Sequence, residues 1–156
     1  MPETDLDLLI KAAQASGEIA KTFFQNAPKT WDKDDNAGPV TEADLAVNTY
    51  LEDVLRTARP DYGWLSEESL DEPERQSSEY VFIIDPIDGT RSYIEGSRTW
   101  AHSLAIARDG RITAAAVLLP MRDMMFSAAL DQGALLNGET LRVSSQKGFE
   151  RSEILA

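Results

Sequence analysis

Apolar residues recur every three to four positions in two stretches of the chain, which predicts two amphipathic helices. The first helix is expected over residues 5–27, with Thr4 before it as a candidate N-cap and Pro28 directly after it. The second helix is expected over 42–58, with Thr41 as its N-cap. The two apolar stripes are Leu6, Leu9, Ile10, Ala13, Gly17, Ala20 and Phe24, and Val47, Leu51, Val54, Leu55 and Ala58.

Most of the remaining chain has the alternating or short apolar runs that are typical of strands. Residues 29–40 are rich in turn formers and are expected to be loop. Asp109-Gly110 and Asn137-Gly138 favour tight hairpin turns. Sequential hairpins indicate an α+β fold, in which an antiparallel β-meander sheet packs against two long helices. Strands are expected near 62–65, 80–84, 101–108, 111–119, 123–129 and 134–143.

Length and composition indicate a globular domain. The chain has 156 residues, of which 42% are hydrophobic, so it can bury a core of ordinary size. It contains no apolar run long enough to span a membrane, and its first residues lack the features of a signal peptide. Cysteine is absent, which excludes disulfides and thiolate metal sites. A cytoplasmic protein without membrane partners is the expectation.

The charge of the chain restricts its partners. With 27 acidic and 15 basic residues the net charge is −12, which argues against binding of a nucleic acid polymer through its backbone. An anionic substrate would also be repelled. Bound divalent cations would reverse the local charge and remove that obstacle.

Candidate chemistry is concentrated in Asp85-Pro-Ile-Asp-Gly-Thr90, which follows the apolar run 80–84. Pro86 stiffens the backbone and Gly89 permits a sharp turn. Two carboxylates and a free carbonyl could therefore be directed to one point, as hard divalent cations require. The alternative is an ordinary turn, because Asp, Pro and Gly all favour turns.

Further acidic residues occur where other apolar elements begin or end. Glu67 and Glu68 follow the run 62–65, and Asp44 lies three residues after the expected cap Thr41. From its spacing alone, Asp44 is better explained as part of a capping box. A calcium-binding EF-hand loop starting at Asp32 is excluded, because glycine and the final glutamate are not at the required positions.

Four stretches of the chain carry a further signal: Gly38-Pro-Val-Thr-Glu-Ala-Asp44, Leu65-Ser-Glu-Glu-Ser69, Asp85-Pro-Ile-Asp-Gly-Thr-Arg-Ser-Tyr93 and Gly133-Ala-Leu-Leu-Asn-Gly138. In this order they resemble the motifs of the inositol monophosphatase family of Mg-dependent, Li-sensitive phosphatases, which includes 3′(2′),5′-bisphosphate nucleotidases. The resemblance implies a Mg-dependent phosphomonoesterase that acts on a small phosphorylated substrate, of the inositol monophosphate or 3′-phosphoadenosine 5′-phosphate type. It also implies two or three Mg²⁺ ions and a homodimer for the complete form.

The resemblance assigns roles to individual residues. The metal ligands would be Glu67, Asp85, the Ile87 carbonyl and Asp88. Asp44 and Thr90 would form a pair that activates water, and the amides of Gly89 and Thr90 would bind phosphate. Lys33 and Glu68 are further candidates for the site. Lys33 is equally explained as a solvated loop lysine. His102, the only histidine, is read as structural, and Arg91 as exposed or in contact with substrate.

The resemblance also predicts the domain organisation. Residues 1–151 would form an N-terminal α+β domain that binds metal and phosphate. Residues 152–156 would begin a strand leading to a C-terminal α/β domain, which in the family supplies one more metal-binding aspartate and has no counterpart in this sequence. The alternative function is therefore a catalytically incomplete, metal-binding fragment or truncated family member.

Overall fold

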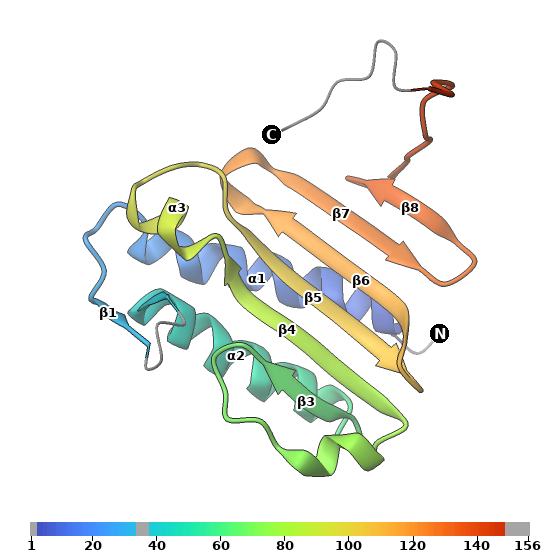
Figure 1. The fold of residues 1–156 in the computed structure, drawn as a ribbon, viewed down its shortest axis with the longest axis horizontal. Coiled ribbons are helices and arrows are strands. Elements are labelled where there is room, and N and C mark those ends of the chain that lie inside the picture. Colours follow the sequence, from blue (N-terminus) through green and yellow to red (C-terminus); the bar gives the residue numbers. More distant parts are fainter. Residues whose placement is uncertain (1–2, 34–37, 149–156) are drawn as a thin grey trace.

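The computed structural model describes residues 3–33 and 38–148. Two long helices, α1 (Asp5–Phe23) and α2 (Glu42–Ala58), lie side by side on one face of a seven-stranded sheet (Figure 1). The predicted α+β fold, with a mostly antiparallel sheet packed against two helices, is confirmed. The strand predicted to begin at residue 152 lies outside the described residues.

The strands follow the chain across the sheet in the order β3 to β9. From β4 onward all neighbours are antiparallel, as the predicted hairpins require. The meander prediction is wrong for β3, which pairs parallel to β4 after a connection that contains the short helix η2 (Pro73–Ser77). The strands are β3 (Gly63–Ser66), β4 (Tyr80–Asp88), β5 (Ala101–Arg108), β6 (Arg111–Leu119), β7 (Met124–Ala129), β8 (Gly133–Leu136) and β9 (Glu139–Thr140).

Both predicted hairpin turns are present. Asp109 and Gly110 have φ angles of 48° and 77°, and Asn137 and Gly138 have 49° and 85°. Two consecutive left-handed residues form the turn that matches the twist of the flanking strands. The second turn divides the predicted strand 134–143 into β8 and β9, so that expectation of one strand was wrong.

Two predicted segments near the N-terminus differ in the structure. Helix α1 ends at Phe23 instead of residue 27, because Gln25 and Ala27 take left-handed φ angles of 61° and 47°. Residues 29–40 were expected to be loop, yet they contain the antiparallel strands β1 (Thr30–Asp32) and β2 (Pro39–Thr41). Three-residue strands are too short to leave a periodic pattern in the sequence.

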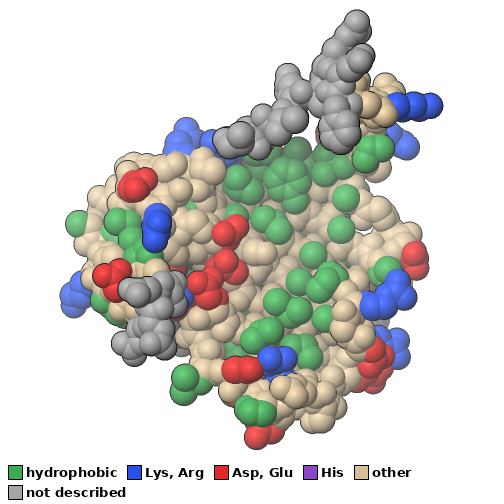
Figure 2. Space-filling view, in the orientation of Figure 1, with side chains coloured by type: hydrophobic (Ala, Val, Ile, Leu, Met, Phe, Trp, Pro, Cys, Tyr) green, Lys and Arg blue, Asp and Glu red, His purple; other side chains and the backbone are tan. Residues whose placement is uncertain are grey.

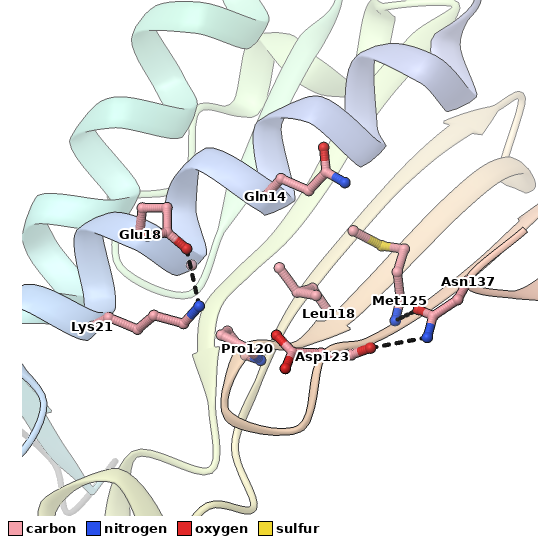
Figure 3. A pocket seen from close by; sticks show the side chains of 9 residues that line it. Gln14, Glu18, Lys21, Leu118, Pro120, Asp123, Met125 and Asn137 are labelled. Atoms are coloured by element: carbon pink, nitrogen blue, oxygen red, sulfur yellow. Dashed lines mark hydrogen bonds and ion pairs between the residues drawn. The ribbon is translucent and has the colours of Figure 1, made fainter.

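The core lies between the sheet and the two helices. Along β6, Ala114, Ala116 and Leu118 are buried, whereas their neighbours are more exposed. Helix α1 comes closest at Gly17, where an added Cβ would lie 3.2 Å from Leu118. A cavity of about 210 Å³ lies beside this contact and shares no residue with the acidic positions predicted to bind metal. Its lining residues, drawn in Figure 3, are Gln14, Gly17, Glu18, Lys21, Leu118, Pro120, Asp123, Met125 and Asn137.

The described helices α1 and α2 leave the other face of the sheet uncovered. Figure 2 shows hydrophobic side chains spread over this face and a group of acidic side chains beside them. On this face Ile83 of β4, the strand next to the edge strand β3, is 37% exposed. None of the described helices is long and apolar enough to cross a bilayer.

Candidate active site

Strand β4 is longer than the sequence predicted, because it continues past residue 84 to Asp88. Asp85 pairs with Ser103 of β5, and Asp88 pairs with Ala101. Three residue steps along β4 therefore correspond to two along β5. Such a mismatch is a β-bulge, in which one strand has an extra residue.

The bulge consists of Pro86 and Ile87, which together face the single residue His102 on β5. Proline has no N–H group for a strand ladder, and within sheets it is found at bulges or edges. Pro86 is thus compatible with β4, although this strand lies between β3 and β5. A sequence rule that ends strands at proline misses this arrangement.

The bulge determines where the two aspartates point. Residues that pair directly across a ladder share one face of the sheet. Because Ser103 and Ala101 are two positions apart, their partners Asp85 and Asp88 lie on the same face. In a regular strand, residues three positions apart would point to opposite faces. The bulge therefore brings both carboxylates to the face that α1 and α2 leave uncovered.

Asp85 is the most strongly perturbed carboxyl of the group. Burial, together with the negative charges of Glu67, Asp88 and Asp44, raises its pKa to about 7. A hydrogen bond with Glu67 adds to this shift. Its Oδ1 atom is buried and has no hydrogen-bond partner among the described residues. A nearby cation would satisfy this oxygen and offset the repulsion.

Glu67 and Glu68 follow the end of β3, beside the bulge. The Glu67 amide donates a hydrogen bond to the Ile84 carbonyl at 3.1 Å. The Lys33 ammonium lies 2.9 Å from Glu67 Oε1 and 2.5 Å from Glu68 Oε1. Burial raises the pKa of Glu68, and the hydrogen bond from Lys33 opposes that effect. Lys33 and both glutamates, predicted as site residues, are therefore brought together.

Asp44 serves the helix and the site with different oxygen atoms. It is fully buried near the start of α2, where Oδ2 accepts hydrogen bonds from the Thr41 amide at 2.8 Å and from the Thr41 hydroxyl at 2.5 Å. The Thr41 hydroxyl accepts from the Asp44 amide at 3.3 Å, which completes a capping box. Oδ1 is left to accept from the Thr90 hydroxyl at 3.1 Å. Burial raises the pKa of Asp44, against the effect of these bonds.

The Thr90 hydroxyl has two acceptors and one proton. Its Oγ1 atom lies 3.1 Å from Asp44 Oδ1 and 3.0 Å from the Ile87 carbonyl oxygen. When the proton points to Asp44, the Ile87 carbonyl is free for another partner, and the lone pairs of Oγ1 can accept a hydrogen bond. The predicted catalytic pair is thus in contact, and it adjoins the predicted carbonyl ligand.

Gly89 makes the turn between β4 and the short helix α3 (Thr90–Ile94). It has φ 88° and ψ 41°, a left-handed conformation that strains residues with a Cβ atom. The turn lets the helix begin directly after the strand. The assignment of phosphate to the Gly89 and Thr90 amides stays a prediction.

The donor atoms fit a hard divalent cation in their chemistry, since they are all oxygens. They are the carboxylates of Glu67, Asp85 and Asp88 and the carbonyl of Ile87. The unpartnered Asp85 Oδ1 supports the fit. Within residues 3–33 and 38–148, however, no group of three such side chains is arranged so that it could hold a metal ion. Glu67 is paired with Lys33 instead.

The capping box expected from the spacing of Thr41 and Asp44 is present. Sequence reasoning missed one contact that shapes the site, which joins the buried ring of His102 to the Pro86 carbonyl. No sequence pattern indicates this contact, because it depends on the register of β4 and β5. Arg91 is exposed at the start of α3.

The similarity of the chain to known proteins agrees with its fold. The model of the inositol monophosphatase family matches residues 1–156. The chain belongs to this family. The resemblance recognised in the four sequence motifs is therefore confirmed.

Individual relatives cover the same region at moderate identity. The chain is 34% identical over 147 residues to the Nus factor SuhB of Pseudomonas aeruginosa, covering 93% of this chain and 54% of that protein. It is 31% identical over 150 residues to the inositol-1-monophosphatase of Rhizobium meliloti, covering 96% and 56%. The crystal structure of the extragenic suppressor protein suhB from Bartonella henselae matches with a TM-score of 0.83 at 30% identity, covering 90% and 54%. This family member thus spans about half the length of the relatives it matches.

Proposed function

We propose that the protein is a Mg²⁺-dependent phosphomonoesterase that hydrolyses a small phosphorylated alcohol or nucleotide. Substrates of the inositol monophosphate or 3′-phosphoadenosine 5′-phosphate type are the leading choices. The observation that carries this proposal is the hydrogen bond from Thr90 to the buried Asp44, immediately beside the Asp85 carboxylate cluster. A hydroxyl–carboxylate pair next to a hard-cation donor set is suited to hydrolysis by water.

Glu67, Asp85, the Ile87 carbonyl and Asp88 are the proposed metal ligands. Bound Mg²⁺ would shield phosphoryl charge and make water more acidic. Glu67, Asp85 and the Ile87 carbonyl would hold one ion, and Asp85 and Asp88 would hold a second. The remaining ligand of the second ion would come from outside residues 1–156, in a C-terminal domain. A homodimer of the complete form is proposed on the same family basis.

Asp44 and Thr90 would position and activate the attacking water. The Thr90 hydroxyl donates a hydrogen bond to Asp44 Oδ1. Its oxygen can then accept a hydrogen bond from the water, which would attack the phosphorus. The capping bonds from Thr41 keep Asp44 in place and leave Oδ1 directed at Thr90. The protein's task is therefore orientation, the main source of catalysis in phosphoryl transfer.

The phosphate group is proposed to lie at the Gly89–Thr90 turn, where backbone amides begin α3. Lys33 is a cationic side chain of the acidic cluster, where it contacts both Glu67 and Glu68. In this proposal it helps to balance the acidic cluster around an anionic substrate.

Two other functions are less well supported. A catalytically incomplete metal-binding domain would use the same ligands, and it predicts Mg²⁺ binding without phosphate release. Several relatives are named Nus factor SuhB, a name that hints at a nucleic-acid or protein partner for those proteins. A direct contact of this chain with nucleic acid is disfavoured by its net charge of −12.

The test uses the complete form, because residues 1–156 alone would lack a ligand of the second ion. It compares phosphate release by the wild type, Asp85→Asn and Asp61→Asn over a panel of phosphomonoesters, with Mg²⁺ or with a chelator. Asp61 is exposed outside the site, so its variant controls for the loss of one charge. We expect Mg²⁺-dependent release in the wild type and the control, and none in Asp85→Asn, whose circular dichroism should stay native. Wild-type turnover in Asp85→Asn would remove this residue from the site. Binding of Mg²⁺ without release from any ester would favour the incomplete domain.

A further inference from the structure

His102 lies on β5, next to the bulge of β4 that carries the proposed metal ligands. It is the only histidine of the chain, and its side chain is fully buried. It occupies the position on β5 opposite Pro86 and Ile87. Since neighbouring residues of a strand alternate between faces, His102 points to the helix-covered face while its neighbour Ser103 shares the face of Asp85.

The ring of His102 is bound to the bulge through one nitrogen. Nδ1 contacts the Pro86 carbonyl oxygen. A carbonyl oxygen can only accept, so Nδ1 carries the proton and the ring is the donor. Nε2 is buried and has no hydrogen-bond partner in the described part of the chain. Burial lowers the pKa of His102 to about 4, which agrees with a neutral ring.

Aromatic packing fixes the direction of this donor. The Trp100 ring lies edge-on to the imidazole, with centroids 5.6 Å apart and planes at 77°. The centroid of the Trp100 ring lies 4.9 Å from that of Tyr93 and 5.6 Å from that of Phe24. The Tyr93 hydroxyl donates to the Ala20 carbonyl at 2.7 Å, which ties this cluster to α1. The ring therefore has little freedom to leave the carbonyl.

The position of this bond matters because Pro86 lies between Asp85 and Ile87. The Pro86 carbonyl and the Ile87 amide belong to the same peptide bond. Rotation of that bond would therefore change the backbone at both Pro86 and Ile87. A buried carbonyl that loses its hydrogen-bond partner is unfavourable, and this favours rearrangement of a bulge that has no regular ladder to restrain it.

We propose that His102 is a positioning residue for the metal site: its Nδ1–H, donated to the Pro86 carbonyl from the helix-covered face, holds the bulge in the shape that directs the Asp85 and Asp88 carboxylates and the Ile87 carbonyl to the metal. This inference rests on the proposed metal-dependent function. His102 touches neither metal nor substrate, and it acts only through the backbone of the bulge.

The test uses His102→Asn and His102→Leu. The amide nitrogen of Asn can take the place of Nδ1 and keep the donor, whereas Leu has a similar bulk and no donor. Mg²⁺ affinity is measured by isothermal titration calorimetry, with Asp85→Asn as the control that abolishes the site. We expect His102→Leu to bind Mg²⁺ 10–100-fold more weakly than the wild type, the usual effect of losing a residue that orients a ligand. His102→Asn should recover most of the affinity, and thermal unfolding should show both variants folded.

A spectroscopic readout is independent of metal. A long-range ¹H–¹⁵N spectrum of the imidazole should show the neutral tautomer with its proton on Nδ1. A proton on Nε2 would overturn the proposal, as would equal Mg²⁺ affinity in the wild type and His102→Leu, or equal weakening in Asn and Leu. These outcomes leave the proposed function intact if Asp85→Asn still abolishes binding. Absence of Mg²⁺ binding in the wild type would overturn both.

Discussion

At the scale of single residues, the site depends on side chains that divide their polar atoms between structure and chemistry. Asp44 caps α2 with Oδ2 and accepts from Thr90 with Oδ1. The spacing of Thr41 and Asp44 predicted the cap, and the family resemblance predicted the catalytic role. The structure shows that the two roles do not compete, because each oxygen has its own partner.

Replacement of Thr90 should separate water activation from metal binding. Thr90→Ala removes the hydroxyl that donates to Asp44 and keeps the carboxylates and the Ile87 carbonyl. We expect kcat to fall about 10²–10⁴-fold, the usual cost of losing acid–base assistance, with little change in Mg²⁺ affinity. Thr90→Ser is the matched control, because it retains the hydroxyl and should keep most of the activity. Steady-state kinetics at saturating Mg²⁺ would refute this role if the Ala variant matched the wild type.

The buried His102 should make stability depend on pH. Its pKa is lowered to about 4 in the folded state, from about 6.5 in an unfolded chain, so the unfolded state binds the proton more tightly. The folded state should therefore lose stability as pH falls from about 6.5 towards 4, by at most about 1.4 kcal/mol per pH unit. Urea unfolding between pH 7 and 4.5 should show a steeper loss in the wild type than in His102→Asn. Parallel pH profiles would contradict the lowered pKa.

At the scale of elements, periodic segments were predictable and irregular ones were not. Helix α2 and strands β5 and β6 agree with the predicted 42–58, 101–108 and 111–119. The bulge in β4 was missed because its cause is the register against β5, which is a tertiary property. The parallel pairing of β3 with β4 was missed for a similar reason, since an apolar run does not indicate whether a strand pairs parallel or antiparallel with its neighbour.

The capping box should stabilise α2 measurably. Thr41→Ala removes the hydroxyl that accepts from the amides of Ala43 and Asp44, so the free energy of unfolding should fall by about 0.5–2 kcal/mol. Thr49→Ala is a suitable comparison, because Thr49 is an exposed residue in the middle of the same helix. Its effect should be near zero or slightly stabilising, since Ala has the higher helix propensity. Chemical denaturation of both variants measures the difference, and equal effects would mean that the cap contributes nothing.

At the scale of the whole molecule, the fold brings distant acidic residues to the carboxyl ends of the parallel strands β3 and β4. Glu67 follows β3, Asp85 and Asp88 lie on the bulge of β4, and Asp44 begins α2. The sequence motifs predicted that these residues act together, through the family resemblance. They could not predict the ion pairs from Lys33 to Glu67 and Glu68, because that contact spans 34 positions and depends on the β1–β2 hairpin.

The net charge of −12 leads to a final prediction about anions. A surface with this excess of carboxylates repels phosphates, so binding of inorganic phosphate should require a divalent cation that reverses the charge locally. Calorimetric titration with phosphate should show binding in the presence of Mg²⁺, none with a chelator, and none in Asp85→Asn under either condition. Long RNA or DNA presents many phosphates without an ordered cation, and we expect no binding in fluorescence anisotropy at physiological salt. Tight, salt-sensitive binding of RNA would show instead that a local basic surface outweighs the overall charge.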